Sequence, residues 1–431
     1  MTRILIDSGI EWIGQMPSNW RIERIGSLFK QRNEKVSDDE YQPLSVTKNG
    51  IVKQLENAAK SNDHSNRKKV CINDFVINSR SDRKMSSGVS KLEGSVSLIN
   101  IVLHSNVMDS SYVHYLLKNY GFAEEFYRWG TGIVADLWST NYERMKRILI
   151  PYPSLEEQQK IAKFLDENVA LIDSIIENTK LSIEELKRFK QSVITEAVTK
   201  GLNPSLEMKD SQIEWIGEIP KHWELISIGN AFFFLGGYAY KSDRFVNESD
   251  NQVIRIGNVK NDNLLLDNKQ VFIDDEYAQE TKNFLIKKDD ILFTMTGTKG
   301  KKDYFYTLLV KDKDLTNKKL FINQRVGCFR KKATIYMNYF NYLLKNQAIL
   351  DSIFIYETGT ANQANLGIET IKRTKLIYPP IEEQVQIAEY LDEQCFYFDG
   401  LLKDKEQLIS NFEDYKKSLI YEYVTGKKEV L

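Results

Sequence analysis

Two segments of the sequence combine a short apolar run with a polar loop that carries several cations. The first extends from Ile72 to Lys84 and the second from Lys288 to Lys302. In each, the apolar run is typical of a strand that would anchor the loop, and small loop residues would let backbone amides approach a phosphate group. The cations could neutralise phosphates or donate hydrogen bonds to base edges. This composition favours nucleic-acid binding, although a solvated surface loop has the same character.

The residue types indicate which groups would make these contacts. Arginine can donate two hydrogen bonds to a guanine edge, and Asn or Gln can pair in a similar way with adenine. We therefore expect base contacts from Arg80, Arg83, Gln324 and Arg325. Two tight turns, at Gly130 to Gly132 and at Thr358 to Thr360, offer hydroxyls and amides to the DNA backbone or to a groove edge. The complete set of expected DNA-binding residues is Arg80, Arg83, Lys84, Lys48, Thr131, Thr296, Thr298, Lys299, Lys301, Gln324, Arg325 and Thr360.

No catalytic or cofactor motif accompanies these residues. Neither a dinucleotide-binding glycine pattern nor a phosphate loop is present, because Met295 occupies the place of the first glycine before Gly297 to Lys301. The four histidines form no metal-binding pair, and Asp74 and Asp82 are read as turn and strand-edge residues rather than nuclease ligands. We expect no catalytic residue, no metal site and no cofactor in this chain. The alternative is a single-chain methyltransferase or nuclease with an unseen motif.

Two blocks of the sequence occur twice. The first contains Trp-Ile-Gly-x-x-Pro-x-x-Trp, which begins at Trp12 and recurs 203 positions later at Trp215. The second contains Pro-x-(Leu/Ile)-Glu-Glu-Gln-x-x-Ile-Ala, which begins at Pro153 and recurs 226 positions later at Pro379. The material between the repeated blocks scarcely matches. The chain is therefore expected to hold two different nucleic-acid-binding domains in equivalent positions.

Each second block is predicted to open a long helix. The segment from Leu155 to Lys200 contains neither Gly nor Pro, and apolar residues recur along it in steps of four and three. The expected seams are Ile161, Leu165, Ile172, Ile175, Leu186, Phe189 and Val193 in the first copy, and Ile387, Leu391, Phe398, Leu401, Leu408, Phe412, Tyr415 and Leu419 in the second. We expect the copies to pair antiparallel, because neither helix can bury its seam alone. The alternative is that each helix packs on its own domain.

The segments before the helices carry short β-branched and aromatic runs, each followed by one predicted helix, at Tyr112 to Trp129 and at Met337 to Tyr356. The predicted fold class is therefore α+β: two globular α+β domains separated by a pair of long antiparallel coiled-coil helices, with a pseudo-twofold internal duplication. The expected boundaries are 1–153 and 201–379 for the globular domains, and 154–200 and 380–431 for the helices.

Charge and composition are consistent with this layout. The net charge of -1 argues against DNA binding, but residues 1–153 carry 21 Lys and Arg against 17 Asp and Glu, and residues 201–379 carry 25 against 22. The helical segments are acidic. Three widely spaced cysteines argue against a disulfide framework, and no apolar stretch approaches the roughly 20 residues that a membrane span needs. We expect a cytoplasmic protein with no signal peptide and no membrane partner.

The two repeated motifs resemble those of the specificity subunit of type I restriction-modification systems, over essentially the whole chain. The resemblance implies that the globular segments are target-recognition domains, each reading one half of a bipartite site in double-stranded DNA, and that the helices set the spacing. It also implies two methyltransferase subunits that carry S-adenosylmethionine, and two restriction subunits that use ATP and Mg²⁺. The rival interpretation is a coiled-coil scaffold with two protein-binding heads and no DNA role.

Overall fold

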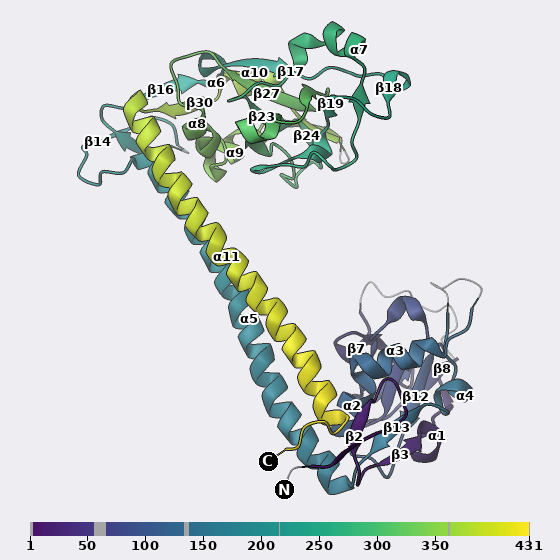
Figure 1. Cartoon of the computed structure of the whole chain (residues 1–431). Coiled ribbons are helices and arrows are strands. Elements are labelled where there is room, and N and C mark those ends of the chain that lie inside the picture. The colour runs from purple at the N-terminus through teal and green to yellow at the C-terminus, as the bar shows by residue number, and fades with distance from the viewer. Residues whose placement is uncertain (1–2, 56–65, 133–137, 215, 361–362, 431) are drawn as a thin grey trace. The chain divides into compact units, whose positions relative to one another are not determined.

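The computed structural model describes residues 3–55, 66–132, 138–214, 216–360 and 363–430. The chain divides into two compact units: unit 1 comprises Met1–Leu181 with Asp404–Leu431, and unit 2 comprises Ser182–Lys403. Each unit contains one globular head and part of two long helices, α5 (Leu155–Lys200) and α11 (Ile381–Val424), drawn in Figure 1.

In unit 1, a series of short strands and helices precedes α5 (Figure 1). Its strands are β1 (Leu5–Asp7), β2 (Gln15–Pro17), β3 (Arg21–Arg24), β4 (Lys30–Gln31), β5 (Lys35–Val36), β6 (Leu44–Thr47), β7 (Gly50–Lys53), β8 (Arg67–Val70), β9 (Phe75–Asn78), β10 (Ser87–Val89), β11 (Gly94–Val96), β12 (Asn100–His104) and β13 (Leu149–Tyr152). Its shorter helices are α1 (Ile25–Leu28), the 3-10 helix η1 (Ser81–Arg83), α2 (Ser110–Lys118), α3 (Tyr120–Arg128) and α4 (Tyr142–Met145).

The main sheet of unit 1 has the strand order β10-β9-β12-β4 with antiparallel neighbours. All four residues of β9 are buried, because side chains of a strand point alternately to its two faces and both faces are covered. Phe75 and Ile77 belong to the main core with helices α2 and α3, whereas Val76 belongs to a smaller core with Val96 and Val102. This strand is therefore a rigid base for the loop that follows it at Arg80.

Unit 2 follows the same plan with more strands. They are β14 (Met208–Asp210), β15 (Glu218–Pro220), β16 (Glu224–Ser227), β17 (Phe232–Gly236), β18 (Phe245–Val246), β19 (Asn251–Ile254), β20 (Val259–Lys260), β21 (Asn263–Leu264), β22 (Phe272–Ile273), β23 (Ile291–Thr294), β24 (Thr296–Gly297), β25 (Thr307–Leu309), β26 (Lys319–Ile322), β27 (Val326–Lys331), β28 (Glu357–Thr360), β29 (Gln363–Leu366) and β30 (Lys375–Tyr378). The helices are α6 (Ile228–Ala231), η3 (Ser242–Arg244), η4 (Ile256–Asn258), α7 (Asp275–Glu280), η5 (Lys282–Phe284), η6 (Asp312–Leu315), α8 (Met337–Leu343), α9 (Gln347–Phe354) and α10 (Ile368–Arg373).

The main sheet of unit 2 has the order β17-β27-β23-β25, and a second sheet has the order β18-β22-β19-β26. The ring of Phe293 in β23 stacks on that of Phe329 in β27 with centroids 4.3 Å apart. Gly327 lies against the ring of Phe293, where a Cβ atom would be only 2.3 Å from the ring. Strand β23 is buried on both faces, as β9 is in unit 1, and it anchors the loop that begins at Met295.

The two long helices lie side by side and antiparallel in each unit. In unit 1, Phe164 of α5 lies against Tyr423 of α11 with ring centroids 4.4 Å apart, and farther along α5 Asp173 pairs with Lys416. The residue numbers thus rise along one helix as they fall along the other.

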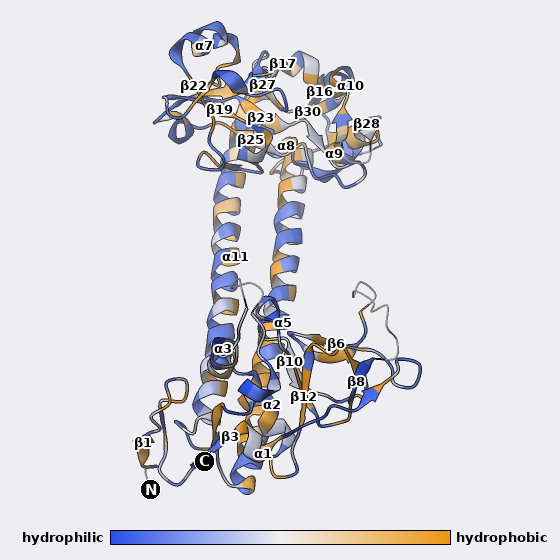
Figure 2. Cartoon of the chain, turned by 90° about the vertical axis from the view of Figure 1, so that its right-hand side faces the viewer, coloured by the Kyte–Doolittle hydropathy of each residue, from blue (hydrophilic) through white to orange (hydrophobic). Residues whose placement is uncertain are grey.

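In unit 2, the ring of Phe189 in α5 meets that of Phe398 in α11 edge-on at 5.7 Å. Farther along α5, Glu196 lines the same cavity as Tyr390 of α11. The predicted pairing is therefore confirmed, together with the α+β fold class. Figure 2 shows that hydrophilic residues predominate along α11, with hydrophobic residues at intervals.

The predicted seams are wrong at several positions. Leu408 and Tyr415 are 43% and 53% exposed, whereas Ile176 and Ile183 of α5 are buried. An α-helix turns once every 3.6 residues, so a stripe read with a repeat of 3.5 drifts around a long helix. Along each long helix, the apolar residues that face the other helix therefore shift from one set of heptad positions to the next.

Each of the two predicted domain helices is in fact a pair. Asn119 ends α2 and caps α3 by accepting a hydrogen bond from the amide of Phe122, and Asn346 caps α9 in the same way through Ala348. An Asn at this place starts a new helix because its side chain replaces a missing backbone acceptor.

Equivalent tyrosines hold each head to the long helices. In unit 1, the Tyr115 hydroxyl donates to Asp166 Oδ1 at 2.7 Å, and in unit 2 the Tyr342 hydroxyl donates to Asp392 Oδ1 at 2.7 Å. Burial raises the pKa of both phenols, so they stay protonated and act as donors. The five residues Tyr-Leu-Leu-Lys-Asn, at 115–119 and 342–346, thus form a third repeated motif.

Within the described ranges, no helix is both long and apolar enough to cross a bilayer. Cys71, Cys328 and Cys395 are free thiols.

Candidate nucleic-acid interface

Arg80 and Thr131 lie on either side of Ser139 in unit 1. The backbone of Ser139 forms an antiparallel bridge with each of them, and its amide donates to the carbonyl of Thr131 at 3.1 Å. The Ser139 hydroxyl donates to that of Ser79 at 3.0 Å, which ties this ladder to the end of β9. Two expected contact residues that are distant in sequence are therefore neighbours on one edge of the unit.

The cations of this loop are held by nearby carboxylates. Asp82 lies 3.3 Å from the guanidinium of Arg80 and 3.6 Å from that of Arg83, while Lys84 pairs with Glu124 at 3.1 Å. These side chains are 43%, 68% and 49% exposed, and exposed ion pairs contribute little to stability. The pairs can therefore be exchanged at small cost for a phosphate or a base edge.

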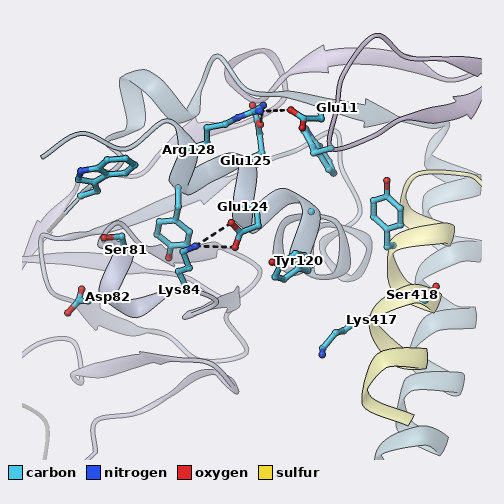
Figure 3. Close-up of a pocket in the computed structure, with 15 residues that line it drawn as sticks. Glu11, Ser81, Asp82, Lys84, Tyr120, Glu124, Glu125, Arg128, Lys417 and Ser418 are labelled. Carbon is cyan, nitrogen blue, oxygen red and sulfur yellow. Dashed lines mark hydrogen bonds and ion pairs between the residues drawn. The ribbon is translucent and has the colours of Figure 1, made fainter. Parts of the chain in front are cut away.

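A cavity of about 970 Å³ opens beside this loop, between α3, the loop and the last turns of α11. Figure 3 shows Lys84 directed at Glu124 and Arg128 directed at Glu11 on its walls. Trp12, Trp138, Tyr120, Tyr127 and Tyr421 supply the aromatic part of the lining. The cavity thus combines stacking surfaces with charged groups, next to the residues expected to contact DNA.

Lys48 is separate from this group. It lies exposed at the tip of the β6–β7 hairpin and borders a second cavity of unit 1, together with Met85 and Lys118.

In unit 2, Thr296 and Thr358 lie on either side of Asn365. Strand β24 pairs with β29 through Thr296 and Asn365, and β29 pairs with β28 through Asn365 and Thr358. This ladder corresponds to the one around Ser139. In each unit, the ladder joins the loop after the buried strand, β9 or β23, to a segment that precedes a long helix, α5 or α11. Thr360 ends β28, and its side chain lies outside the described part of the structure.

Gln324 and Arg325 form an exposed turn between β26 and β27. The amide of Met295 donates to the Arg325 carbonyl at 3.0 Å, which places this turn against the start of the loop. Gln324, Thr296, Asn365 and Lys372 all line one open cavity of about 740 Å³. Two side-chain amides and a hydroxyl therefore line one cavity, and a side-chain amide can pair with an adenine edge.

The loop from Thr298 to Lys301 is folded back on itself. The amide of Thr298 donates to Asp303 Oδ1 at 2.7 Å, which lowers the pKa of that carboxyl, and the amide of Gly300 donates to Glu357 Oε2 at 2.9 Å. Lys299 donates to the Gly359 carbonyl at 3.2 Å, and Lys301 is exposed. These two amides are thus occupied, contrary to the expectation that they face a phosphate.

The structure brings seven of the twelve expected residues into two clusters and adds residues that the sequence did not single out. Arg80, Arg83, Lys84 and Thr131 lie together in unit 1, and Thr296, Gln324 and Arg325 lie together in unit 2. Ser139 and Asn365 were missed because only strand pairing makes them central. Lys118 was also missed, although the repeated Tyr-Leu-Leu-Lys-Asn motif could have indicated it.

Among the residues that the structure describes, no group of three or more His, Cys, Asp and Glu side chains is placed to hold a metal ion.

Comparison with known proteins places the chain in a family. The family model for the type I restriction modification DNA specificity domain matches residues 17–187 and again residues 220–409. The MjaVIII type I restriction enzyme specificity subunit of Methanocaldococcus jannaschii is 25% identical, over 96% of this chain and 94% of that protein. The EcoBI type I specificity subunit of Escherichia coli is 23% identical, over 65% of this chain and 58% of that protein.

Two solved structures show the same fold. One comes from work on the complex assembly and conformational transition of the type I R-M system; its TM-score is 0.73 at 12% identity, covering 96% of this chain and 99% of that one. The HsdS subunit of Thermoanaerobacter tengcongensis has a TM-score of 0.53 at 13% identity, covering 96% and 98%. With two matched domains, paired long helices and a relative aligned over 96% of the chain, this chain belongs to the family of type I restriction-modification DNA specificity subunits.

Proposed function

We propose that each globular head is a target-recognition domain and that the two heads read the two halves of a bipartite site in double-stranded DNA. The observation that carries this proposal is the equivalent ladder in each unit, centred on Ser139 in one and on Asn365 in the other. Two domains that place different side chains at equivalent positions are suited to recognising two different DNA sequences. Residues 1–153 and 201–379 are the domains proposed for this role.

The side chains at each ladder support different preferences. In unit 1, Arg80 and Arg83 flank the ladder, and arginine pairs with the O6 and N7 acceptors of guanine. In unit 2, Gln324 and Asn365 line one cavity, and side-chain amides pair with adenine. We therefore assign a guanine contact to the first half-site and an adenine contact to the second, with Arg325 beside it.

Two methyltransferase subunits would dock on equivalent faces of the long helices. Leu171 on α5 and Tyr397 on α11 occupy matching places in the duplicated blocks, and both are 61% exposed. Phe396, next to Tyr397, is 84% exposed. Large apolar side chains left in water on matching surfaces favour two copies of one partner.

Catalysis would reside in these partners. S-adenosylmethionine would be bound by the methyltransferase subunits, and ATP and Mg²⁺ by two restriction subunits. This chain would contribute specificity alone, without being an enzyme, and would act in the cytoplasm where the DNA lies.

Methylation mapping tests the proposal. The chain is co-expressed with its methyltransferase subunits in a host that lacks other DNA methylation, and modified positions are sequenced. We expect one two-part motif with a fixed gap, which disappears when this chain is omitted. Methylation that persists without this chain, or that follows a single uninterrupted motif, would contradict the proposal.

A further inference from the structure

A second cavity of unit 1, of about 750 Å³, is rich in cations. It lies between the tip of the β6–β7 hairpin, helix α2 and the two long helices. Five lysines line it, against the two carboxylates Asp173 and Glu413. The lysines are Lys48 from the hairpin, Lys118 from α2, Lys180 from α5, and Lys416 and Lys417 from α11. We call this cavity the lysine cleft.

Lys118 is the cation whose charge is least compensated. It is half-buried, and no carboxylate of the described residues forms an ion pair with it. Lys416 pairs with Asp173 and Lys417 with Asp414, whereas Lys48 and Lys180 have no ion pair among the described residues but are exposed to water. Burial lowers the pKa of Lys118, and the nearby Lys416 lowers it further. An ammonium group that has lost part of its water without gaining a counter-ion attracts an anion strongly.

Unit 2 contains the matching lysine, but there it is neutralised. Lys345 is the counterpart of Lys118 in the repeated Tyr-Leu-Leu-Lys-Asn motif, and it pairs with Asp262. Asp262 lies at the tip of the β20–β21 hairpin, in the sequence Asn261-Asp262. The corresponding hairpin tip in unit 1 reads Lys48-Asn49. The first unit therefore has a cation and an amide at the hairpin tip, where the second has an amide and a carboxylate.

The lysine cleft adjoins the loop that we expect to contact DNA. Met85, which borders the cleft, directly follows Lys84 in that loop. The hairpin also touches strand β10, because a Cβ atom on Gly88 would lie 3.2 Å from the Cα of Gly50. A duplex held by Arg80 and Arg83 would thus carry its backbone past the cleft.

We infer that the lysine cleft of unit 1 binds phosphate groups of the DNA backbone beside the first half-site, and that the Lys345–Asp262 pair closes the equivalent place in unit 2. This inference rests on the proposed function for the position of the DNA. It adds a contact that is independent of sequence and present in one half only. Phosphate contacts of unit 1 would then contribute more to the salt dependence of DNA affinity than those of unit 2.

The test measures how binding depends on salt. The chain, assembled with its methyltransferase subunits, is titrated with fluorescein-labelled duplexes that contain or lack the mapped site, between about 50 and 200 mM NaCl. Lys118→Gln is expected to make the slope of log affinity against log salt shallower by about 1, equally on both duplexes, because one phosphate contact is lost. An unchanged slope in a variant with the wild-type melting temperature would overturn the inference.

Reciprocal exchanges at the hairpin tips supply matched controls. Asn49→Asp places a carboxylate where unit 2 has Asp262, so it should reduce the slope as Lys118→Gln does, without altering a buried residue. Asp262→Asn releases Lys345 and should steepen the slope by up to about 1. Lys163→Gln, an exposed change on α5 outside the cleft, should leave it unchanged. If Asn49→Asp has no effect, the cleft does not contact DNA.

Two further measurements separate other anions from DNA. If Lys118→Gln weakens co-purification of the methyltransferase subunits, and the complex assembled with an excess of these subunits keeps the wild-type slope, an acidic partner surface occupies the cleft and the inference fails. It also fails if inorganic phosphate raises the melting temperature in a Lys118-dependent way without any change in slope. Failure of the proposed function looks different, because the wild-type complex would then bind both duplexes equally well.

Discussion

The indole Nε1 of Trp20 donates a hydrogen bond to Glu157 Oε2 over 2.8 Å, which joins the first repeated motif to the first turn of α5. Trp223 and Glu383 make the same contact in unit 2 over 2.9 Å. Each tryptophan is buried, so its N–H needs a partner, and the carboxylate is favoured where the helix begins. These two contacts explain why the two repeated motifs occur together.

Glu157→Gln is expected to destabilise unit 1 by about 1–3 kcal/mol, because Trp20 and Arg3 both lose a charged acceptor. The measurement is the thermal unfolding of the full chain. Glu156→Gln is the matched control, since Glu156 is 77% exposed and pairs only with Lys160 among the described residues; its effect should stay within about 0.5 kcal/mol. Equal effects of the two changes would contradict this role for Glu157.

Arg80→Ala and Arg325→Ala are expected to relax recognition at one half-site each, by roughly 1–3 kcal/mol if they make bidentate base contacts. The readout is methylation of a library in which every base pair of the mapped site is varied. Each variant serves as the control for the other, because Arg80 belongs to unit 1 and Arg325 to unit 2. Loss of preference in both halves from one substitution would argue against independent readers.

Lengthening both long helices should lengthen the gap in the recognised site. Seven residues inserted after Thr179 in α5 and after Lys405 in α11 add two helical turns, or about 10 Å. This corresponds to roughly three base pairs at 3.4 Å each. Methylation mapping gives the new gap directly. An insertion in one helix only should abolish modification, because the antiparallel pair would lose register.

Stability should fall in mild acid through His114. Burial, with a smaller effect of the nearby Lys118, lowers its pKa to about 4, whereas a histidine of the unfolded chain titrates at about 6.5. Between these two pKa values the histidine of the unfolded chain binds a proton and that of the native chain does not. The contribution of His114 to the free energy of unfolding is therefore complete above about pH 6.5 and is lost as the pH falls towards about 4, by up to about 3 kcal/mol.

The geometry at His114 agrees with this direction. Its Nδ1 accepts a hydrogen bond from the amide of Val89 at 3.3 Å, which protonation of that nitrogen would remove. Urea unfolding between pH 7.5 and 5 measures the effect. His114→Gln should flatten the dependence, and a variant as pH-sensitive as the wild type would show that other groups cause it.

Much of the architecture was predictable because its signals are local. The helix predicted from Leu155 to Lys200 has those bounds in the structure, since the segment lacks Gly and Pro and has acidic residues in its first turn. The antiparallel pairing followed from two long apolar seams that neither helix could bury alone. Asn119 and Asn346 were the local signals that were missed, and each divides a predicted helix in two.

The candidate site was predictable in composition but not in arrangement. The sequence by itself determined the duplicated plan, the two cationic or amide-rich loops and the strands that anchor them, because apolar periodicity and residue type act over a few neighbouring residues. Only the tertiary structure decided that Arg80 meets Thr131 across Ser139, and that Lys118 lacks the carboxylate that Asp262 gives to Lys345. Such contacts join residues far apart in the chain, and their energies depend on the burial and charge around each group once the whole unit has folded.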